Sequence, residues 1–307
     1  GSGAPFVIEA DEYDTAFFDK RAKFMHYWPR HLALTNLEFD HADIYPDLAS
    51  IRRQFHHLVR TVPAAGRIAW NVADAALAET LEMGCWTPLT GFAREAAVAE
   101  WRVRLLEQDG SAFELLHRER DAGTVRWPLI GMHNVTNGLA AVVCAAGMGV
   151  PPAQSAAALA GFIGVRRRLE LRGDVRGIRV YDDFAHHPTA VASTIDAVRR
   201  QATGQRVVAV LEPRSNTMRL GVHRAELAAS FAAADRIWLY QPAGLDWNVD
   251  GLATDLGEKA AVARDLPRLV EALASELRAG DRVLIMSNGG FGGLHERLLK
   301  ALRERRP

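Results

Sequence analysis

The sequence predicts an α/β protein built on parallel sheets. Short β-branched or aromatic runs recur along the chain and alternate with segments whose apolar residues have helical spacing. Strands that alternate with helices in this way favour parallel sheets covered by helices. Between residues 100 and 130 the pattern changes to short strands around Asp-Gly and Ala-Gly turns. This change predicts a small antiparallel insert in an otherwise parallel architecture.

Strands and helices are expected to follow one another closely in the first half. The expected strands are Phe6–Ala10, Leu32–Thr35, Arg67–Trp70, Trp101–Leu105, Ala112–Leu116 and Thr124–Ile130. The expected helices are Asp47–Val62, Asp74–Met83, Asn134–Gly147 and Pro152–Gly161. The Asp47–Val62 segment has apolar residues three and four positions apart, which is the spacing of one buried helical face.

The second half is more regular than the first. Its expected strands are Ile178–Tyr181, Val207–Leu211, Ile237–Tyr240 and Val283–Ser287, with helices between them. This order is typical of a Rossmann-like parallel-sheet domain. We expect the domain boundary at the arginine run that precedes it, so that residues 1–165 form a partial central domain and residues 166–307 form the C-terminal domain.

Composition excludes several classes of protein. With 37 basic and 37 acidic residues the formal net charge is zero, which argues against nucleic acid as a partner. No apolar run approaches the length of a membrane span, so a cytoplasmic protein with no membrane partner is expected. Cys85 and Cys144 are far apart and lack a CxxC context, as expected of free thiols in a reducing compartment.

The segment from Val180 to Thr189 is the strongest functional signal. Asp182, Asp183, His186 and His187 lie where a buried strand should end and a helix should begin at Pro188. Ligands of open α/β sheets bind beyond the carboxyl ends of strands. The alternative is an ordinary turn in which Asp183 caps the helix and the histidines are solvated.

Two acidic segments could bind a metal ion. Glu9, Asp11, Glu12 and Asp14 lie within six residues at the end of an expected strand, and their charges repel unless a cation neutralises them. Oxygen ligands of this kind suit Mg²⁺. The segment around His41 follows the next strand and could share that site. The alternatives are a solvated acidic loop and a set of turn and cap residues.

Three more segments could bind ligands. His133, Asn134 and Asn137 enter a helix, and capping explains only one of them. The run that ends in Arg168 could clamp an anion from the linker. Arg214 follows a strand and could recognise a carboxylate. A glycine-rich turn over Met286–Gly293 resembles a phosphate loop only superficially, because the chain has no Gly-Lys dipeptide and hence no P-loop.

These motifs, in this order, resemble those of the Mur ligase superfamily, which builds the peptidoglycan precursor. The matching strings are EADEYD, NLEFDHAD, GMHNVTN, RRRLE and YDDFAHHPT. The resemblance implies ATP and Mg²⁺ as cofactors and a reaction through an acyl phosphate. By motif position Glu9 and His41 would bind Mg²⁺, Arg168 would reach the γ-phosphate, and Asp183 would contact the nucleotide.

The same resemblance implies roles for five further residues. His133, Asn134 and Asn137 would lie against the adenine side of the nucleotide, and His186 and Arg214 would line the peptide side of the cleft. A finer resemblance is to one branch of the family, which joins the L-alanyl-γ-D-glutamyl-meso-diaminopimelate tripeptide to UDP-N-acetylmuramate in peptidoglycan recycling. It rests on the strings LEPRSNTM and MSNGGFGG and on Tyr13.

Other functions remain open at this point. The nearest alternative adds L-alanine to UDP-N-acetylmuramate. From other classes, the acidic and histidine residues could belong to a metal-dependent hydrolase, or the second domain could be a binding module without chemistry. The family's P-loop and UDP-sugar domain would precede EADEYD. We therefore expect a fragment with little or no ligase activity by itself, since removing even one preorganised donor costs about 10²–10³ in rate.

Overall fold

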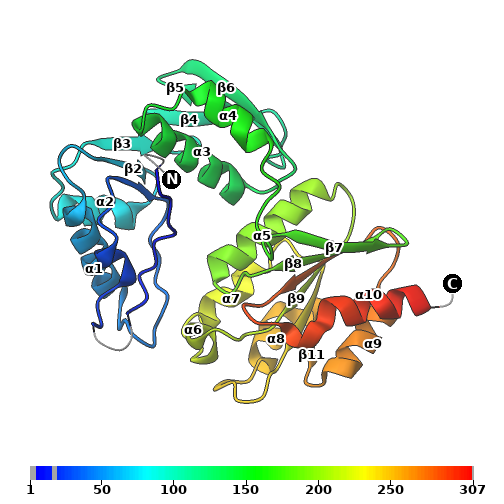
Figure 1. Cartoon of the computed structure of the whole chain (residues 1–307). Coiled ribbons are helices and arrows are strands. Elements are labelled where there is room, and N and C mark those ends of the chain that lie inside the picture. Colours follow the sequence, from blue (N-terminus) through cyan, green and yellow to red (C-terminus); the bar gives the residue numbers. More distant parts are fainter. Residues whose placement is uncertain (1–4, 16–18, 306–307) are drawn as a thin grey trace. The chain divides into compact units, whose positions relative to one another are not determined.

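The computed structural model describes residues 5–15 and 19–305. The chain forms two compact units. The first contains Gly1–Arg104, Glu114–Thr124 and Thr136–Ala158, and the second contains Leu105–Phe113, Val125–Val135 and Leu159–Pro307. Figure 1 shows a sheet and its helices at either end of the chain. The α/β class predicted from the sequence is confirmed.

The first sheet has six strands in sequence order, from β1 to β6. They are β1 (His31–Leu34), β2 (Arg67–Asn71), β3 (Leu89–Phe92), β4 (Trp101–Leu105), β5 (Ala112–His117) and β6 (Arg120–Arg126). The pairs β1–β2, β2–β3 and β3–β4 are parallel. The associated helices are η1 (Lys23–His26), α1 (Leu48–Thr61), α2 (Ala75–Glu82), α3 (Met132–Gly147) and α4 (Pro152–Ala160).

Local signals explain where α1 and α2 begin and where α1 ends. The Asp47 carboxylate accepts a hydrogen bond from the Ser50 N–H at 2.7 Å and caps α1. The Asp74 carboxylate caps α2 in the same way through the Leu77 N–H. Helix α1 ends just before Pro63, because the residue before a proline is disfavoured in the helical conformation.

The strands β4, β5 and β6 form the antiparallel insert. Only Arg118 and Glu119 separate β5 from β6, and both have positive φ, as in a tight hairpin turn. Neighbouring strands joined by two residues are antiparallel, since a parallel pair needs a longer crossover. Strand β6 ends at Arg126 and not at Ile130 as predicted. Pro128 has no N–H with which to extend the ladder.

The second sheet has the order β11-β10-β9-β12-β8-β7. Its strands are β7 (Glu170–Val175), β8 (Ile178–Asp183), β9 (Val207–Leu211), β10 (Arg236–Tyr240), β11 (Ala260–Ala263) and β12 (Arg282–Met286). All neighbours are parallel except β7 and β8. The central strands β9 and β12 are buried along their whole length, as expected for a sheet covered on both faces.

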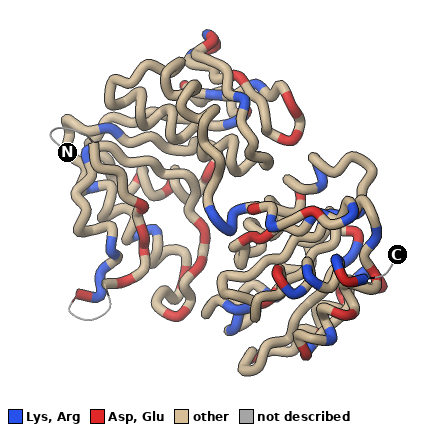
Figure 2. The backbone as a smooth tube through the Cα atoms, turned by 45° about the vertical axis from the view of Figure 1, so that its right-hand side comes forward, with Lys and Arg blue, Asp and Glu red and all other residues tan. Residues whose placement is uncertain are grey.

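Helices cover both faces of this sheet (Figure 1). The helices are α5 (Pro188–Gln201), α6 (Asn216–Arg219), α7 (Arg224–Ser230), α8 (Asp250–Leu256), η2 (Gly257–Lys259), α9 (Leu266–Glu276), η3 (Phe291–Gly293) and α10 (Leu294–Glu304). Helices α5, α7 and α8 contribute to the core on one face, and α9 and α10 to the core on the other. Acidic and basic residues are interspersed along the chain (Figure 2).

Some predictions were wrong. Phe6–Ala10 is not a strand; Phe6 is 88% exposed and Val7 is 84% exposed. A strand exists through hydrogen bonds to a neighbour, and this segment pairs with no strand in the described part of the chain. The sequence also failed to predict β3, β7 and β11, whose glycine, charged or alanine residues are poor strand formers. No described helix is long and apolar enough to cross a membrane.

Candidate functional site

In the first unit, the two acidic segments lie against each other. The Tyr45 hydroxyl donates a hydrogen bond to the Glu12 carbonyl at 2.5 Å. The Nε2 atom of His41 lies 3.0 Å from a carboxylate oxygen of Glu12, and the Tyr13 hydroxyl donates to the carboxylate of Asp43. The structure therefore brings together two motifs that are about thirty residues apart in the sequence.

Protein cations neutralise part of this negative charge. The Lys23 ammonium lies 3.0 Å from the Asp11 carboxylate. Burial alone would raise the pKa of Asp11, but hydrogen bonds from the Tyr13 N–H and from Lys23 outweigh it and lower the pKa. The hydrogen bond with Glu12 raises the pKa of His41 above its ordinary value. Burial, and then the charge of Glu12, raise the pKa of Tyr45 to about 12.

Glu9 is the carboxylate of this region that remains available for a cation. Its side chain is exposed and makes no hydrogen bond or ion pair with the described residues. Within residues 5–15 and 19–305, no group of three His, Cys, Asp or Glu side chains is arranged to hold a metal ion. The exposed carboxylate of Glu9 could hold Mg²⁺ only together with other ligands such as waters and phosphates, which is how proteins commonly bind this ion.

In the second unit, the carboxyl ends of three neighbouring strands meet. In the sheet register, Met286 of β12 lies beside Asp183 of β8 and Leu211 of β9. The Ser287 hydroxyl donates to the buried Glu212 carboxylate at 2.6 Å and accepts a hydrogen bond from the Gly289 N–H at 3.0 Å. These contacts shape the glycine-rich turn that follows β12.

Asp183 is buried at the end of β8. Its carboxylate accepts hydrogen bonds from the Leu169 N–H at 2.7 Å and from the Ala185 N–H at 2.8 Å. Burial raises the pKa of Asp183, and these hydrogen bonds oppose the increase. The alternative in which Asp183 caps the following helix is wrong, because the imidazole of His187 accepts the Thr189 N–H at 3.3 Å and caps α5.

His186 and Arg214 lie beyond the same strand ends. The Nδ1 atom of His186 is 2.8 Å from the Phe184 carbonyl oxygen, and its ring packs edge-on against Phe184. The Arg214 side chain is 56% exposed, and its guanidinium lies 4.0 Å from the Glu212 carboxylate. Arg214 passes directly over Gly289, where a Cβ atom would lie 2.3 Å from the Arg214 Cδ. A side chain at this position would therefore displace the outer part of the Arg214 side chain.

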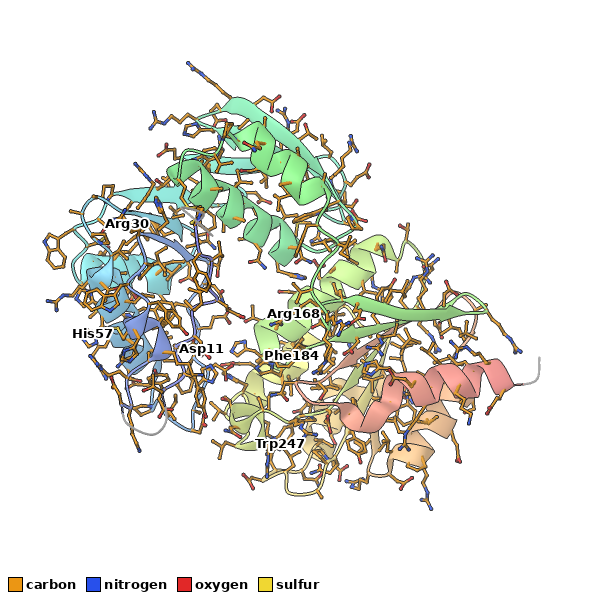
Figure 3. The ribbon with its side chains drawn as sticks, in the orientation of Figure 1. Asp11, Arg30, His57, Arg168, Phe184 and Trp247 are labelled. Carbon is orange, nitrogen blue, oxygen red and sulfur yellow. The ribbon has the colours of Figure 1, made fainter. Side chains whose placement is uncertain are left out.

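The arginine run lies against the end of β8. The guanidinium carbons of Arg167 and Arg168 are each 5.1 Å from the centroid of the Phe184 ring, a cation–π geometry. Figure 3 shows Arg168 beside Phe184. Arg168 is exposed, whereas Arg167 is partly buried. Arg168 therefore carries a fixed positive charge that is open to solvent.

The start of α3 carries the predicted adenine-side residues. Burial, and then the charge of Arg168, lower the pKa of His133, so its imidazole is uncharged near neutral pH. The Asn134 amide donates to the Ile130 carbonyl at 2.8 Å and so binds its own helix start. Asn137 is exposed one turn after His133, on the same side of the helix.

Two domain profiles of one family match the chain. The Mur ligase middle domain matches residues 4–145, and the Mur ligase glutamate ligase domain matches residues 167–289. The chain belongs to the Mur ligase family. The two matches contain EADEYD, NLEFDHAD, GMHNVTN and YDDFAHHPT, and they contain RRRLE except for its first residue, Arg166.

Several known Mur ligases are similar to this chain. The UDP-N-acetylmuramate–L-alanyl-γ-D-glutamyl-meso-2,6-diaminoheptandioate ligase of Escherichia coli K12 is 49% identical over 304 residues, which cover 98% of the chain and 65% of that protein. The UDP-N-acetylmuramate–L-alanine ligase of Acidothermus cellulolyticus is 34% identical over 320 residues, which cover 99% of the chain and 65% of that protein.

A solved Mur ligase structure also matches. The crystal structure of a murein peptide ligase from Psychrobacter arcticus 273-4 superposes with a TM-score of 0.71 at 42% identity. The match covers 98% of this chain and 63% of that one. The chain thus spans about two thirds of the length of the Mur ligases that it resembles.

The structure adds residues that sequence reasoning did not assign to the candidate site. Glu212 and Ser287 form a buried hydrogen-bonded pair at the strand ends, and the guanidinium groups of two arginines pack against the Phe184 ring. A weak signal was present for Glu212, which is a carboxylate directly after the apolar strand Val207–Leu211. No local pattern could predict its partner, because Ser287 lies 75 residues further along the chain.

Proposed function

We propose that this chain is part of an ATP-dependent ligase of peptidoglycan recycling. The ligase joins the L-alanyl-γ-D-glutamyl-meso-diaminopimelate tripeptide to UDP-N-acetylmuramate through an acyl phosphate. One observation carries the proposal: the chain is 49% identical over 304 residues to a ligase named for these substrates, against 34% for a relative named for L-alanine. By itself the chain has little activity, because it contains no P-loop sequence.

Four residues would serve the nucleotide phosphates and their metal ions. Bound Mg²⁺ would neutralise the phosphate charge that phosphoryl transfer must stabilise. Glu9 would hold one ion and His41 another, and the exposed carboxylate of Glu9 supports its part. Arg168 would reach the γ-phosphate, in keeping with its exposed and preoriented guanidinium. Asp183 would contact the nucleotide from the C-terminal domain. Its buried carboxylate also accepts a hydrogen bond from the Leu169 N–H, next to Arg168.

The remaining residues would bind adenine and the incoming peptide. His133 and Asn137 lie one turn apart on α3, and the uncharged imidazole of His133 suits contact with a neutral base. Asn134 would act with them, although its amide also binds the start of the helix. His186 and Arg214 would face the peptide. Arg214 could pair with a peptide carboxylate, as guanidinium groups commonly do.

We also assign the two domains by these roles. Residues 1–165 would be a partial central, ATP-binding domain, and residues 166–307 would be the C-terminal domain. The family matches to residues 4–145 and 167–289 support a boundary between them. The sheet formed by β7–β12 also lies entirely after residue 165.

A competition assay tests the function. The chain is joined to the part of the Escherichia coli relative that it does not match, and is given ATP, Mg²⁺, UDP-N-acetylmuramate and equal amounts of L-alanine and the tripeptide. We expect mass spectrometry to detect the tripeptide adduct and released phosphate. An L-alanine adduct would support the L-alanine ligase instead, and intact ATP with neither adduct would end the ligase proposal.

Matched variants sharpen this assay. Arg168→Gln removes the proposed phosphate contact and should lower kcat by about 10²–10³, the usual effect of losing one preorganised donor. Arg166→Gln removes an exposed arginine of the same run and should leave kcat within about twofold, since surface substitutions away from a site have small effects. The chain without the joined segment serves as the control.

A further inference from the structure

Arg167 is bound far more extensively than its neighbour Arg168. One terminal nitrogen of its guanidinium donates hydrogen bonds to the carbonyl oxygens of Ser287 and Gly289, at 2.5 and 2.6 Å. Its Nε lies 3.6 Å from the buried carboxylate of Asp182. Arg167 therefore ties the arginine run to the turn that follows β12, across more than a hundred residues of sequence.

The backbone around Arg168 is held in an unusual conformation. Arg167 and Leu169 have φ angles of +59° and +52°, in the left-handed region that non-glycine residues rarely adopt. Such a conformation persists only where surrounding contacts over-determine it. Here the Phe184 N–H donates to the Arg167 carbonyl at 2.8 Å, and the Leu169 N–H donates to Asp183 at 2.7 Å.

The same turn also lies next to the Arg214 side chain. The Arg214 side chain lies over Gly289, where a Cβ atom would collide with it. Gly289 is the residue whose carbonyl accepts the Arg167 hydrogen bond, and its N–H donates to the Ser287 hydroxyl. Movement of this turn would therefore disturb Arg214 directly, and it would free the anchor that keeps Arg168 on the Phe184 ring.

We propose that Arg167 is a positioning residue that sets Arg168 and Arg214 through the Ser287–Gly289 turn. This inference rests on the proposed ligase function, in which Arg168 binds phosphate and Arg214 binds the peptide. Arg167 does not contact substrate. It holds the two arginines that do, so its loss misplaces both the phosphate contact and the peptide contact.

The effect on catalysis is tested with the extended ligase, which is the chain joined to the unmatched part of the Escherichia coli relative. Arg167→Gln should lower kcat by about 10²-fold, the effect of misplacing a group by about 1 Å, and should also raise the KM for the tripeptide. Adding Arg167→Gln to Arg168→Gln should lower kcat little further, because both changes remove the same contact. Arg166→Gln should change nothing. If the fold-loss in kcat of the double variant equals the product of the two single losses, Arg167 does not act through Arg168 and the positioning role is overturned.

Amide hydrogen exchange provides a second readout that needs no activity. In the chain itself, Arg167→Gln should speed exchange at Phe184 and Gly289, whose N–H groups are protected by the contacts described above. Arg166→Gln should leave both rates unchanged. If the extended wild type shows no turnover, the proposed function fails while exchange still decides whether Arg167 holds the turn. Unchanged exchange in Arg167→Gln would overturn the inference in either case.

Discussion

Buried charges at the strand ends of the second sheet are held by hydrogen-bond donors placed around them. Asp183 accepts two backbone N–H groups, and Glu212 accepts the Ser287 hydroxyl. Buried carboxylates without such donors would be strongly destabilising. A carboxylate held in this way is a rigid feature of the fold, and this rigidity lets nearby exposed groups such as Arg168 keep one orientation.

The pKa of His133 should report the position of Arg168. Removing the Arg168 charge with Arg168→Gln should raise the pKa of His133 towards its ordinary value of 6.5, without reaching it, because burial remains the larger cause. Histidine NMR titration measures this change, with Arg166→Gln as the control. A pKa that falls or stays the same would show that the two side chains do not interact.

The sign of the accompanying stability change follows from the same shift. Folding lowers the pKa of His133, so the unfolded chain binds the proton more readily. The stabilisation contributed by the uncharged imidazole is complete above about pH 6.5 and is lost as the pH falls through the folded-state pKa. In Arg168→Gln the folded-state pKa should lie closer to the unfolded value, so that loss of stability should be smaller and should be complete at a higher pH.

At the scale of elements, close packing of the start of α3 depends on one glycine. Gly131 has a φ of +95°, and a Cβ atom there would lie 2.6 Å from the His133 ring and 2.8 Å from Ala197 of α5. Gly280 has the same φ but no atom within 4 Å of a Cβ position. Comparing the two glycines therefore distinguishes the cost of backbone strain, which both share, from the cost of crowding, which only Gly131 has.

Replacing each glycine by alanine should give different losses of stability. Gly280→Ala should cost about 1–2 kcal/mol for the left-handed backbone alone. Gly131→Ala should cost about 1–3 kcal/mol more, because the added methyl group overpacks the contact with α5. Denaturant unfolding of the second unit measures both. Equal losses would mean that the start of α3 can shift without cost.

At the scale of the whole molecule, each sheet closes a core of its own. Ile51 lies in the core of the first unit and Ile195 in a core of the second, and both are buried. Separate cores favour unfolding in more than one step. Calorimetry should therefore resolve two transitions. Ile51→Ala should lower the midpoint temperature of one transition only, and Ile195→Ala that of the other only. Each substitution should reduce the stability of its unit by about 2–5 kcal/mol. A single transition that shifts in both variants would contradict this.

Sequence periodicity and turn chemistry determined most elements of the fold. Strand β9 matches its predicted bounds, and α1 and α2 begin at the predicted aspartates. These signals are local, because a helix start depends on a cap within three residues and a buried strand on its own apolar run. The order of motifs also indicated the Mur ligase family, since motif identity needs no knowledge of contacts.

Only the tertiary structure decided which side chains meet. Glu12 pairs with His41, Ser287 pairs with Glu212, and Arg167 reaches a turn 122 residues away. It also decided that Phe6–Ala10 is exposed, although its composition is that of a strand. Local sequence encodes which conformations and charges are available. Which of them are used depends on long-range packing, because a strand needs a neighbour and a buried charge needs a donor that the fold delivers from elsewhere in the chain.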